Sequence, residues 1–361
     1  MRTPDFKCLL FVSFFMAWAI VSNSPLAAND KAKPAAKAPM SPKVGVRTPG
    51  IQIPFEGMKP ELEVAIPTPG AITVGESVFV PSASKDEIVR IETKLSDAKT
   101  VADAATSAAS KTTGFITDVS KPCSGTIVAF DTLWVPNCGT QTVTRHDIKT
   151  NKLIATLPIG AADVSMALAA TTDSVWMFTD RKSTLSRIDP IENRVVGELR
   201  LPPSCNSVAF GEAALWVSCP DESKVLRIDP SANLVVKRIE VAPGPRAVAF
   251  GAGSVWVLCD KEGTIERIDP KSNRVIKTLE LLVPNAGGNI AYGNGFLWVT
   301  QTGFPLTRID TTAEKERVAQ QFWGEGGGEI AVASGAIWLA NPAKGTVQKL
   351  DPKRVLATLS N

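Results

Sequence analysis

The sequence predicts an all-β fold in which one small antiparallel sheet recurs seven times. Tryptophans recur at nearly constant spacing, and each is followed by a basic residue and then a short acidic turn. The segment 243–282 predicts four short strands in about forty residues, because apolar or alternating runs are separated by turn-forming residues. That is the length of one propeller blade. We therefore predict a seven-bladed β-propeller of four-stranded antiparallel blades.

In six of the seven copies a tryptophan marks the first strand pair of the blade. These six, separated by 42, 40, 40, 42 and 40 residues, are Trp134, Trp176, Trp216, Trp256, Trp298 and Trp338. One Trp per blade in mid-strand suits packing between blades, since a buried Trp contributes roughly 150–250 Å² of contact. We interpret these six as core residues. Trp323 does not fit the spacing, and it could face solvent or a ligand.

A seventh copy lies upstream, where Phe79 takes the place of Trp and Arg90 follows 11 residues later. The gap of 55 residues from Phe79 to Trp134 predicts an insertion on the first blade at about Ser96–Gly114, either a loop or a short helix. We expect almost no helix elsewhere. Glu61–Ile66 and Arg354–Leu359 both have the pattern of an outer strand, so either could complete the last blade.

The turn between the third and fourth strands repeats Asp-Pro-x-x-Asn at Asp189–Asn193, Asp229–Asn233 and Asp269–Asn273. Asp accepts a local backbone N–H, Pro presets the next φ, and Asn tolerates the left-handed position that closes the hairpin. We interpret these carboxylates as turn formers and not as metal ligands.

The N-terminus has the pattern of an export signal. Basic Arg2 and Lys7 precede the apolar run Cys8–Val21, and small residues follow up to Ala28, where we expect cleavage. The run of 14 residues is shorter than the ~20 that a spanning helix needs. Residues 29–45 are rich in Lys, Ala and Pro and predict a disordered tether, so the propeller should occupy residues 46–361. We expect a periplasmic or secreted monomer without a membrane span after cleavage.

The charge balance of the body argues against nucleic acid as a partner. Residues 1–45 hold six basic and two acidic residues, so 33 Lys and Arg face 34 Asp and Glu in the remainder. A nucleic-acid surface normally shows a basic excess.

Cysteines in an exported chain predict disulfides. If the first hairpin of the fourth blade turns at Gly211–Ala213, Cys205 and Cys219 face each other across it. Cys123 and Cys138 flank the equivalent hairpin of the second blade, where the turn looks two residues shorter and the pair would be diagonal. Cys259 is left without a partner.

The copies, with Pro-x-x-(Val/Ile)-Ala-Phe-Gly, Ser-Val-Trp-Val and Arg-Ile-Asp-Pro, resemble the YVTN-repeat propellers and the virginiamycin B lyase-like group over about residues 60–361. The resemblance implies the fold, which hosts many functions. For the lyases it implies ring-opening elimination helped by histidine, acidic residues and a divalent metal. This chain departs from that pattern, because its single histidine, His146, stands where other copies have Ile, and we interpret it as a packing or surface variant.

A ligand site is predicted at the funnel where inner strands start and second strands end, since these lie on one face of a propeller. The strand-start positions are Thr126, Ser165, Met166, Asn206, Arg246, Asn289 and Glu329. The strand-end positions are Asn137, Asp180, Cys219, Cys259, Asp260, Gln301 and Asn341. From these we select as ligand-binding candidates Arg246, Asn289, Gln301, Glu329, Asn341, Asn206 and Asp260. Arg246 could grip a carboxylate or phosphate, and Glu329 could act as a base if chemistry occurs.

Two functions follow. The first is an exported scaffold that binds a small molecule or a protein partner on the funnel face. The alternative is a lyase-like or lactone-hydrolysing enzyme that uses carboxylates, and a divalent metal only in that case. Exposure of the loop ends to solvent is a simpler explanation for the polar residues at these positions. The sequence does not identify a cofactor.

Overall fold

The computed structural model describes residues 49–93, 112–160, 167–180, 184–312 and 315–358. All of these residues belong to one compact unit of the chain. The signal segment, the tether and most of the Ser96–Gly114 insertion also lie outside them, and the expectations for these segments stay predictions.

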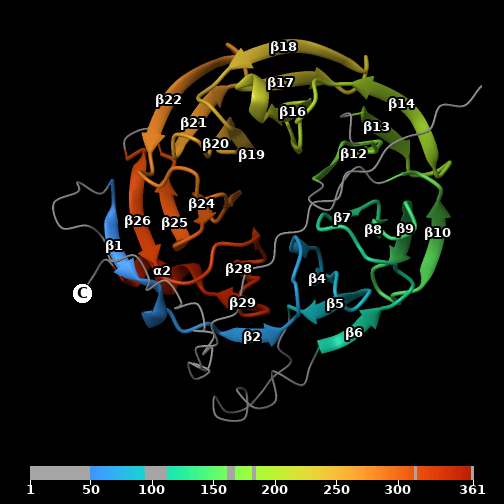
Figure 1. Ribbon diagram of the computed structural model, residues 1–361, viewed down its shortest axis with the longest axis horizontal. Coiled ribbons are helices and arrows are strands. Elements are labelled where there is room, and N and C mark those ends of the chain that lie inside the picture. Colours follow the sequence, from blue (N-terminus) through green and yellow to red (C-terminus); the bar gives the residue numbers. More distant parts are fainter. Residues whose placement is uncertain (1–48, 94–111, 161–166, 181–183, 313–314, 359–361) are drawn as a thin grey trace, which may run out of the picture. The chain divides into compact units, whose positions relative to one another are not determined.

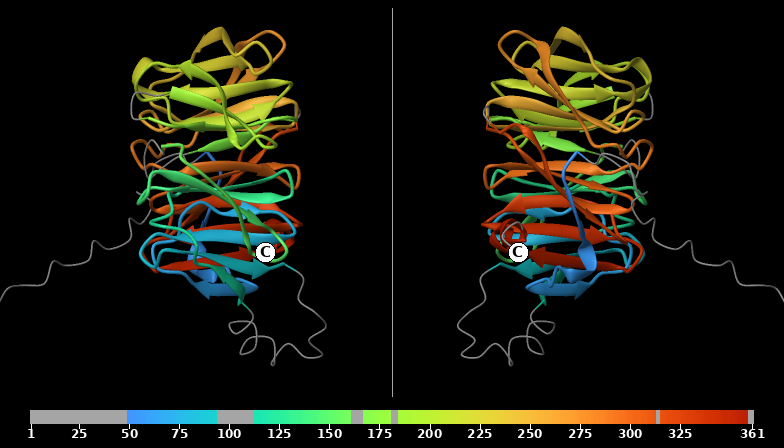
Figure 2. Two further views of the ribbon diagram at one scale, coloured as in Figure 1. Left: turned by 90° about the vertical axis from the view of Figure 1, so that its right-hand side faces the viewer. Right: turned by 90° about the vertical axis from the view of Figure 1, so that its left-hand side faces the viewer.

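The described residues form a ring of seven antiparallel blades, as predicted (Figure 1), and Figure 2 shows this ring edge-on. Blades 1 to 3 are β3 (Thr73–Val74), β4 (Ser77–Ser82), β5 (Glu87–Glu92), β6 (Thr112–Ile116); β7 (Ile127–Ala129), β8 (Thr132–Asn137), β9 (Thr142–Asp147), β10 (Leu153–Leu157); and β11 (Leu168–Ala170), β12 (Val175–Phe178), β13 (Thr184–Asp189), β14 (Arg194–Arg200).

Blades 4 and 5 are β15 (Ser207–Gly211), β16 (Ala214–Cys219), β17 (Lys224–Asp229), β18 (Leu234–Glu240); and β19 (Pro245–Gly251), β20 (Ser254–Cys259), β21 (Thr264–Asp269), β22 (Arg274–Glu280). Blades 6 and 7 contain β23 (Asn289–Gly293), β24 (Phe296–Gln301), β25 (Phe304–Asp310), β26 (Arg317–Trp323); and β27 (Ile330–Ala333), β28 (Ala336–Asn341), β29 (Thr346–Leu350). The other described elements are the short 3-10 turns η1 (Phe55–Gly57) and η2 (Pro220–Glu222), the strands β1 (Ile51–Pro54) and β2 (Leu62–Ala65), and the helix α2 (Pro352–Ala357).

The burial of each strand depends on its place in the blade. Every residue of β20 is buried, because this second strand packs against neighbouring blades on both faces, whereas the outer strand β22 mainly exposes its side chains. The six repeated Trp side chains have 0% exposure, and Phe79 has 1%. This burial agrees with the interpretation of the repeated aromatic residue as core.

The ring closes with a strand from the N-terminal side. β2 (Leu62–Ala65) pairs antiparallel with β29 and supplies the outer strand of blade 7. The expectation of a strand at Arg354–Leu359 is wrong, because Pro352–Ala357 forms the helix α2, with the Asp351 side chain accepting from the Lys353 N–H as N-cap and Pro352 in the first turn.

An extra strand was not predicted. β1 (Ile51–Pro54) pairs parallel with β26 and lies outside it, so blade 6 has five strands (Figure 1). The edge of blade 6 is thereby covered by backbone from the start of the described chain, which satisfies hydrogen-bonding groups that an edge strand would expose.

In blades 1 to 5 the repeated Arg bonds to the following blade, whereas Arg308 of blade 6 bonds to Gln320 and Asp310 of its own blade. In blade 4, Arg227 lies over Trp216 at 5.2 Å from the ring centroid and opposite it in the strand register. Its Nη1 donates to the Pro270 carbonyl (2.7 Å) and to Asn273 Oδ1 (2.8 Å), which belong to the turn of blade 5. Equivalent Arg-to-turn contacts run from Arg90 to Lys149 and Asn151, and from Arg145 to Pro190 and Asn193. We call this contact the inter-blade latch.

The turn chemistry is confirmed. Asp189, Asp229 and Asp269 accept backbone N–H groups two and three residues later. The pKa of each carboxyl is lowered, chiefly by these backbone bonds in Asp189, and chiefly by the side chains of Ser231 and Ser272 in Asp229 and Asp269. The turn ends at Asn193, Asn233 and Asn273, all with positive φ. The carboxylates are therefore used locally, as turn formers.

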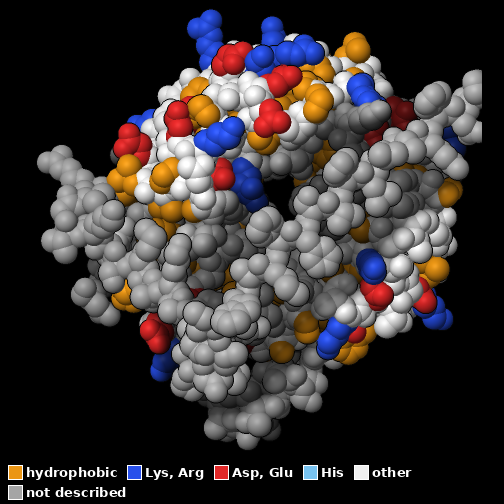
Figure 3. Space-filling view, viewed as in Figure 1, with side chains coloured by type: hydrophobic (Ala, Val, Ile, Leu, Met, Phe, Trp, Pro, Cys, Tyr) orange, Lys and Arg blue, Asp and Glu red, His pale blue; other side chains and the backbone are white. Residues whose placement is uncertain are grey.

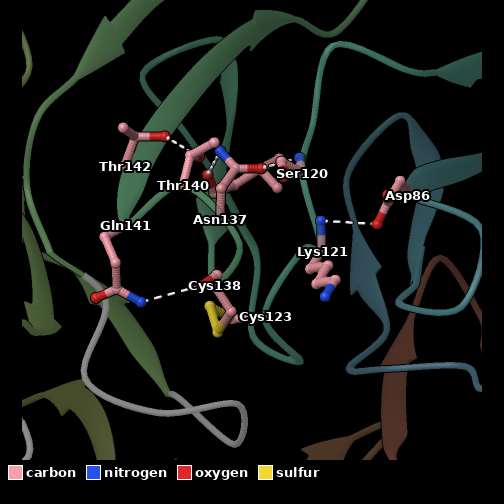
Figure 4. Close-up of a disulfide and its surroundings, with 10 residues drawn as sticks. Asp86, Ser120, Lys121, Cys123, Asn137, Cys138, Thr140, Gln141 and Thr142 are labelled. Carbon is pink, nitrogen blue, oxygen red and sulfur yellow. Dashed lines mark hydrogen bonds between the residues drawn. A yellow bond between two sulfur atoms is a disulfide. The ribbon is translucent and has the colours of Figure 1, made fainter.

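Both predicted disulfides are present, with Cα–Cα distances of 5.2 Å for Cys123–Cys138, drawn in Figure 4, and 3.9 Å for Cys205–Cys219. The predicted register was wrong by one residue, because Val208 pairs with Val217 and the turn consists of Glu212 and Ala213 alone, both with positive φ. The blade 2 turn has the same length, at Phe130 and Asp131, and is not shorter.

Candidate functional site

A cavity of about 260 Å³ lies where the inner strands begin, and all seven blades line it. The lining includes one position from each blade: Ala71, Thr126, Leu168, Asn206, Arg246, Asn289 and Glu329. Figure 3 shows the face in view hollowed near the centre of the ring. The cavity thus collects non-equivalent side chains from a repeated frame.

Glu329 and Asn289 form the polar centre of this cavity. The Asn289 amide, at the start of β23, donates from Nδ2 to Glu329 Oε2 at 2.5 Å, and its Oδ1 accepts from the Ile290 N–H. Desolvation raises the pKa of the Glu329 carboxyl, while the Asn289 hydrogen bond and the nearby positive charge of Arg246 act in the opposite direction. Burial dominates, so this carboxyl takes up a proton more readily than an exposed one.

Arg246, at the start of β19, is exposed and held at one nitrogen. Its Nε donates to the Gly288 carbonyl at 3.0 Å. Within the described residues its two terminal nitrogens make no hydrogen bond or ion pair. The guanidinium is therefore fixed in position and has donors left for an anionic group.

Two other predicted residues line the same cavity. Asn206 is exposed and its Oδ1 accepts from the Ser218 hydroxyl at 3.3 Å. Thr126 is buried and linked to blade 1, because its carbonyl and hydroxyl both contact the Thr73 hydroxyl. Ser165 and Met166 lie outside the described residues.

Three of the predicted ligand-binding residues stabilise loops of the frame and do not line this cavity. Gln301 is fully buried, and its Nε2 donates to the Val283 carbonyl at 2.8 Å. Asn341 is buried and accepts the Lys344 N–H. Asp260 accepts the Gly287 N–H at 2.8 Å and fixes the loop before blade 6. The sequence placed them at strand ends correctly, but these side chains turn toward backbone groups.

Three of the remaining four strand-end residues have local partners, and the fourth is a buried free cysteine. Asn137 accepts the Ser120 N–H, Asp180 accepts from Thr184, Cys219 is in a disulfide, and Cys259 is buried without a bridge. Burial raises the pKa of the Cys259 thiol, which keeps it protonated. His146 is fully buried in β9 beside the Thr144 hydroxyl, and desolvation lowers its pKa. It is a packing residue remote from the cavity lining.

The sequence reasoning missed the contribution of glycine. Gly288 has a φ of 111°, and a Cβ there would lie 1.8 Å from the Thr300 carbonyl oxygen, so no side chain fits. Its own carbonyl anchors Arg246. The pair Gly287-Gly288 directly before a strand was the available signal, because such a pair allows close approach of backbone segments.

The cavity does not fit the divalent metal that the lyase resemblance implies. Among its described lining residues Glu329 is the single carboxylate, it is bonded to Asn289, and the Arg246 cation is nearby. Elsewhere in the described ranges, no three His, Cys, Asp or Glu side chains form a group that could hold a metal ion.

The class of the described unit is a seven-bladed β-propeller with a polar central cavity. Its fold is similar to that of virginiamycin B lyase from Staphylococcus aureus (TM-score 0.63, 16% identity, 80% of this chain and 98% of that chain) and of a streptogramin B lyase (0.62, 17%, 80% and 94%). BamB from Moraxella catarrhalis is similar at a TM-score of 0.56 and 10% identity over 78% of this chain and 84% of that chain. At such identities the likeness concerns the fold. No family model and no curated protein matches the sequence.

The visible surface carries both signs of charge. Figure 3 shows Lys and Arg interspersed with Asp and Glu over the outer blades, in line with the near-neutral composition of the body. In the part of the chain that the structure describes, no helix is long and apolar enough to cross a membrane.

Proposed function

We propose that this chain is an exported propeller that binds a small anionic molecule, such as a carboxylate, in its central cavity. The observation that carries the proposal is Arg246, whose guanidinium is anchored through Nε and leaves its terminal nitrogens unbonded at the cavity. Bidentate donation to a carboxylate or phosphate is the interaction that this geometry suits.

The Asn289–Glu329 pair supplies the second half of the site. A carboxyl whose pKa is raised can donate a hydrogen bond to the ligand when protonated and accept one when ionised. A ligand that carries an anionic group and a hydroxyl would use both Arg246 and Glu329. Export agrees with the two disulfides, which persist in oxidising compartments.

The test uses calorimetric titration of lactate, succinate, citrate and phosphate after a native mass spectrometry screen of the same panel. Arg246→Ala and Glu329→Ala should each weaken binding about tenfold or more, since hydrogen bonds to charged groups contribute ~1.5–3 kcal/mol. Arg238→Ala, which removes an exposed Arg from β18, is the matched control. The thermal stability of the Arg246→Ala and Glu329→Ala variants should stay nearly unchanged. Normal binding by both cavity variants would place the site elsewhere.

Lyase-like or lactone-hydrolysing activity is the second candidate, favoured by the raised pKa of Glu329, because a general base works best near the working pH. Glu329→Gln should then abolish turnover of a lactone panel while retaining binding. Absence of turnover by the unaltered protein would discard this candidate and leave the binding proposal intact.

A further inference from the structure

A second cavity, also of about 260 Å³, lies where the N-terminal segment meets blades 6 and 7. Phe55 of η1 and Trp323 of β26 supply its aromatic lining, and Glu56, Glu325 and Lys344 supply its charged lining. It shares no lining residue with the central cavity. We call it the edge cavity.

Trp323 is unlike the tryptophans of the repeat. They are completely buried, whereas Trp323 is half-buried at the last position of β26, in register with Pro54 of β1. Its indole N–H has no hydrogen-bond partner among the described residues. Blade packing therefore does not account for this side chain, which presents part of its ring to the edge cavity.

Phe55 is held in place on the other side. It packs against the cluster that contains Trp298 and Phe322, so its position is fixed by the blade 6 core. Gly324 lies beneath it, and a Cβ on Gly324 would come to 3.4 Å from the Phe55 Cβ. The two aromatic side chains do not stack on each other in the described structure, and the space between the elements that carry them stays open.

The three charged side chains that line the edge cavity, Glu56, Glu325 and Lys344, together carry one net negative charge. Lys344 Nζ lies 3.8 Å from Glu325 Oε2, with both side chains mostly exposed. Glu56 is exposed and forms no ion pair or hydrogen bond within the described ranges. An uncompensated carboxylate next to two aromatic rings attracts a cation, because the ring faces are the negative part of the aromatic quadrupole.

We propose that the edge cavity binds an organic ammonium group, which contacts the Trp323 and Phe55 rings and is neutralised by Glu56. The shared chemistry is a methylated or alkylated ammonium, which can come from a small molecule or from a basic side chain of a peptide. Quaternary ammonium recognition by aromatic side chains follows the same physics. The site is independent of the proposed function of the central cavity.

The experiment titrates choline into the full chain and compares it with 3,3-dimethylbutan-1-ol, its uncharged counterpart of similar shape. Binding is measured by calorimetry, and Trp emission serves as a second readout, since Trp323 is the one tryptophan of the described residues that is not fully buried. We expect choline to bind at least about tenfold more tightly than the alcohol. A trimethyllysine peptide, run in parallel, identifies the source: tighter binding than choline indicates a peptide, and equal or weaker binding a small molecule.

Two variants test the roles of the residues. Glu56→Gln should weaken choline binding about fivefold to tenfold, and Trp323→Leu should weaken it more, because Leu keeps apolar bulk without the ring. Glu280→Gln, which neutralises an exposed carboxylate at the end of β22, is the matched control. Equal binding of choline and the alcohol, equal effects of the Glu56 and Glu280 variants, or no choline binding by the folded protein would overturn the proposal. A failure to find any ligand for the central cavity would not affect the proposal for the edge cavity.

Discussion

The two ends of the blades are built on different principles. At the turn end, defined by the hairpins such as Gly251–Ser254 and the Asp-Pro turns such as Asp269–Asn273, the same contacts recur from blade to blade. At the entrance end, where the central cavity opens, residues at equivalent positions range from Ala71 to Arg246 and Glu329. The repeated turn contacts maintain the propeller frame, and the variable side chains at the entrance end give the central cavity its functional groups.

The means of stabilisation differ in the same way. The turn end is held by latches such as Arg227 to Asn273, whereas the entrance end of blades 2 and 4 is held by disulfides across the first hairpin. Because the entrance lacks the repeated turn, covalent bridges restrict the chain there.

The largest effect is expected from the bridge of blade 4. Replacing Cys205 and Cys219 together by Ala should lower the free energy of unfolding by about 3 kcal/mol, because a loop of this length is no longer closed in the unfolded chain. Urea denaturation monitored by circular dichroism measures the change. Cys259→Ala, which leaves both bridges intact, should cost less. An unchanged midpoint in the double variant would show that the bridge does not stabilise the entrance end.

Removing one latch should have a smaller effect. Arg227→Ala should cost about 2 kcal/mol, since two hydrogen bonds to the blade 5 turn and the contact with Trp216 are lost. Asn273→Gly removes the acceptor side chain while tolerating the positive φ. A double-mutant cycle should give a coupling energy between the two positions. Strict additivity would contradict the latch, and Arg238→Ala controls for loss of charge.

The smallest effect concerns pH and His146. The pKa of His146 is lowered in the folded state, so the unfolded chain binds the proton more readily. The contribution of His146 to stability is therefore fully present above the ordinary histidine pKa of ~6.5, and it is lost as the pH falls below that value. The slope is at most about 1.4 kcal/mol per pH unit for one group. His146→Ile, which restores the residue of Ile188 and Ile228, should remove this contribution. Because the chain has one histidine, its proton NMR signal reports the pKa directly, and a normal value would refute the prediction.

Some features of the candidate site were accessible from sequence and others were not. Arg246, Asn289, Asn206 and Glu329 could be placed at the entrance, because strand starts follow from the repeat. Gln301 and Asp260 occupy the same end, but their side chains bond to backbone groups, a choice that depends on loops of other blades. The pattern gives position along the strand and does not give side-chain direction at its end.

By itself the sequence determined the number of blades, the buried Trp of six of them and Phe79 of the first, the Asp-Pro-x-x-Asn turns and the two disulfides, because all of these depend on local spacing. Only the tertiary structure decided how the ring closes. Asp351-Pro352 resembles a turn start, but Val355 stands where Asn closes the other turns, and the chain continues as α2. The open edge of blade 7 was therefore available to Leu62–Ala65, which is remote in sequence. The Arg latches were equally hidden, because the two halves of each latch lie in different copies and meet only when the ring forms.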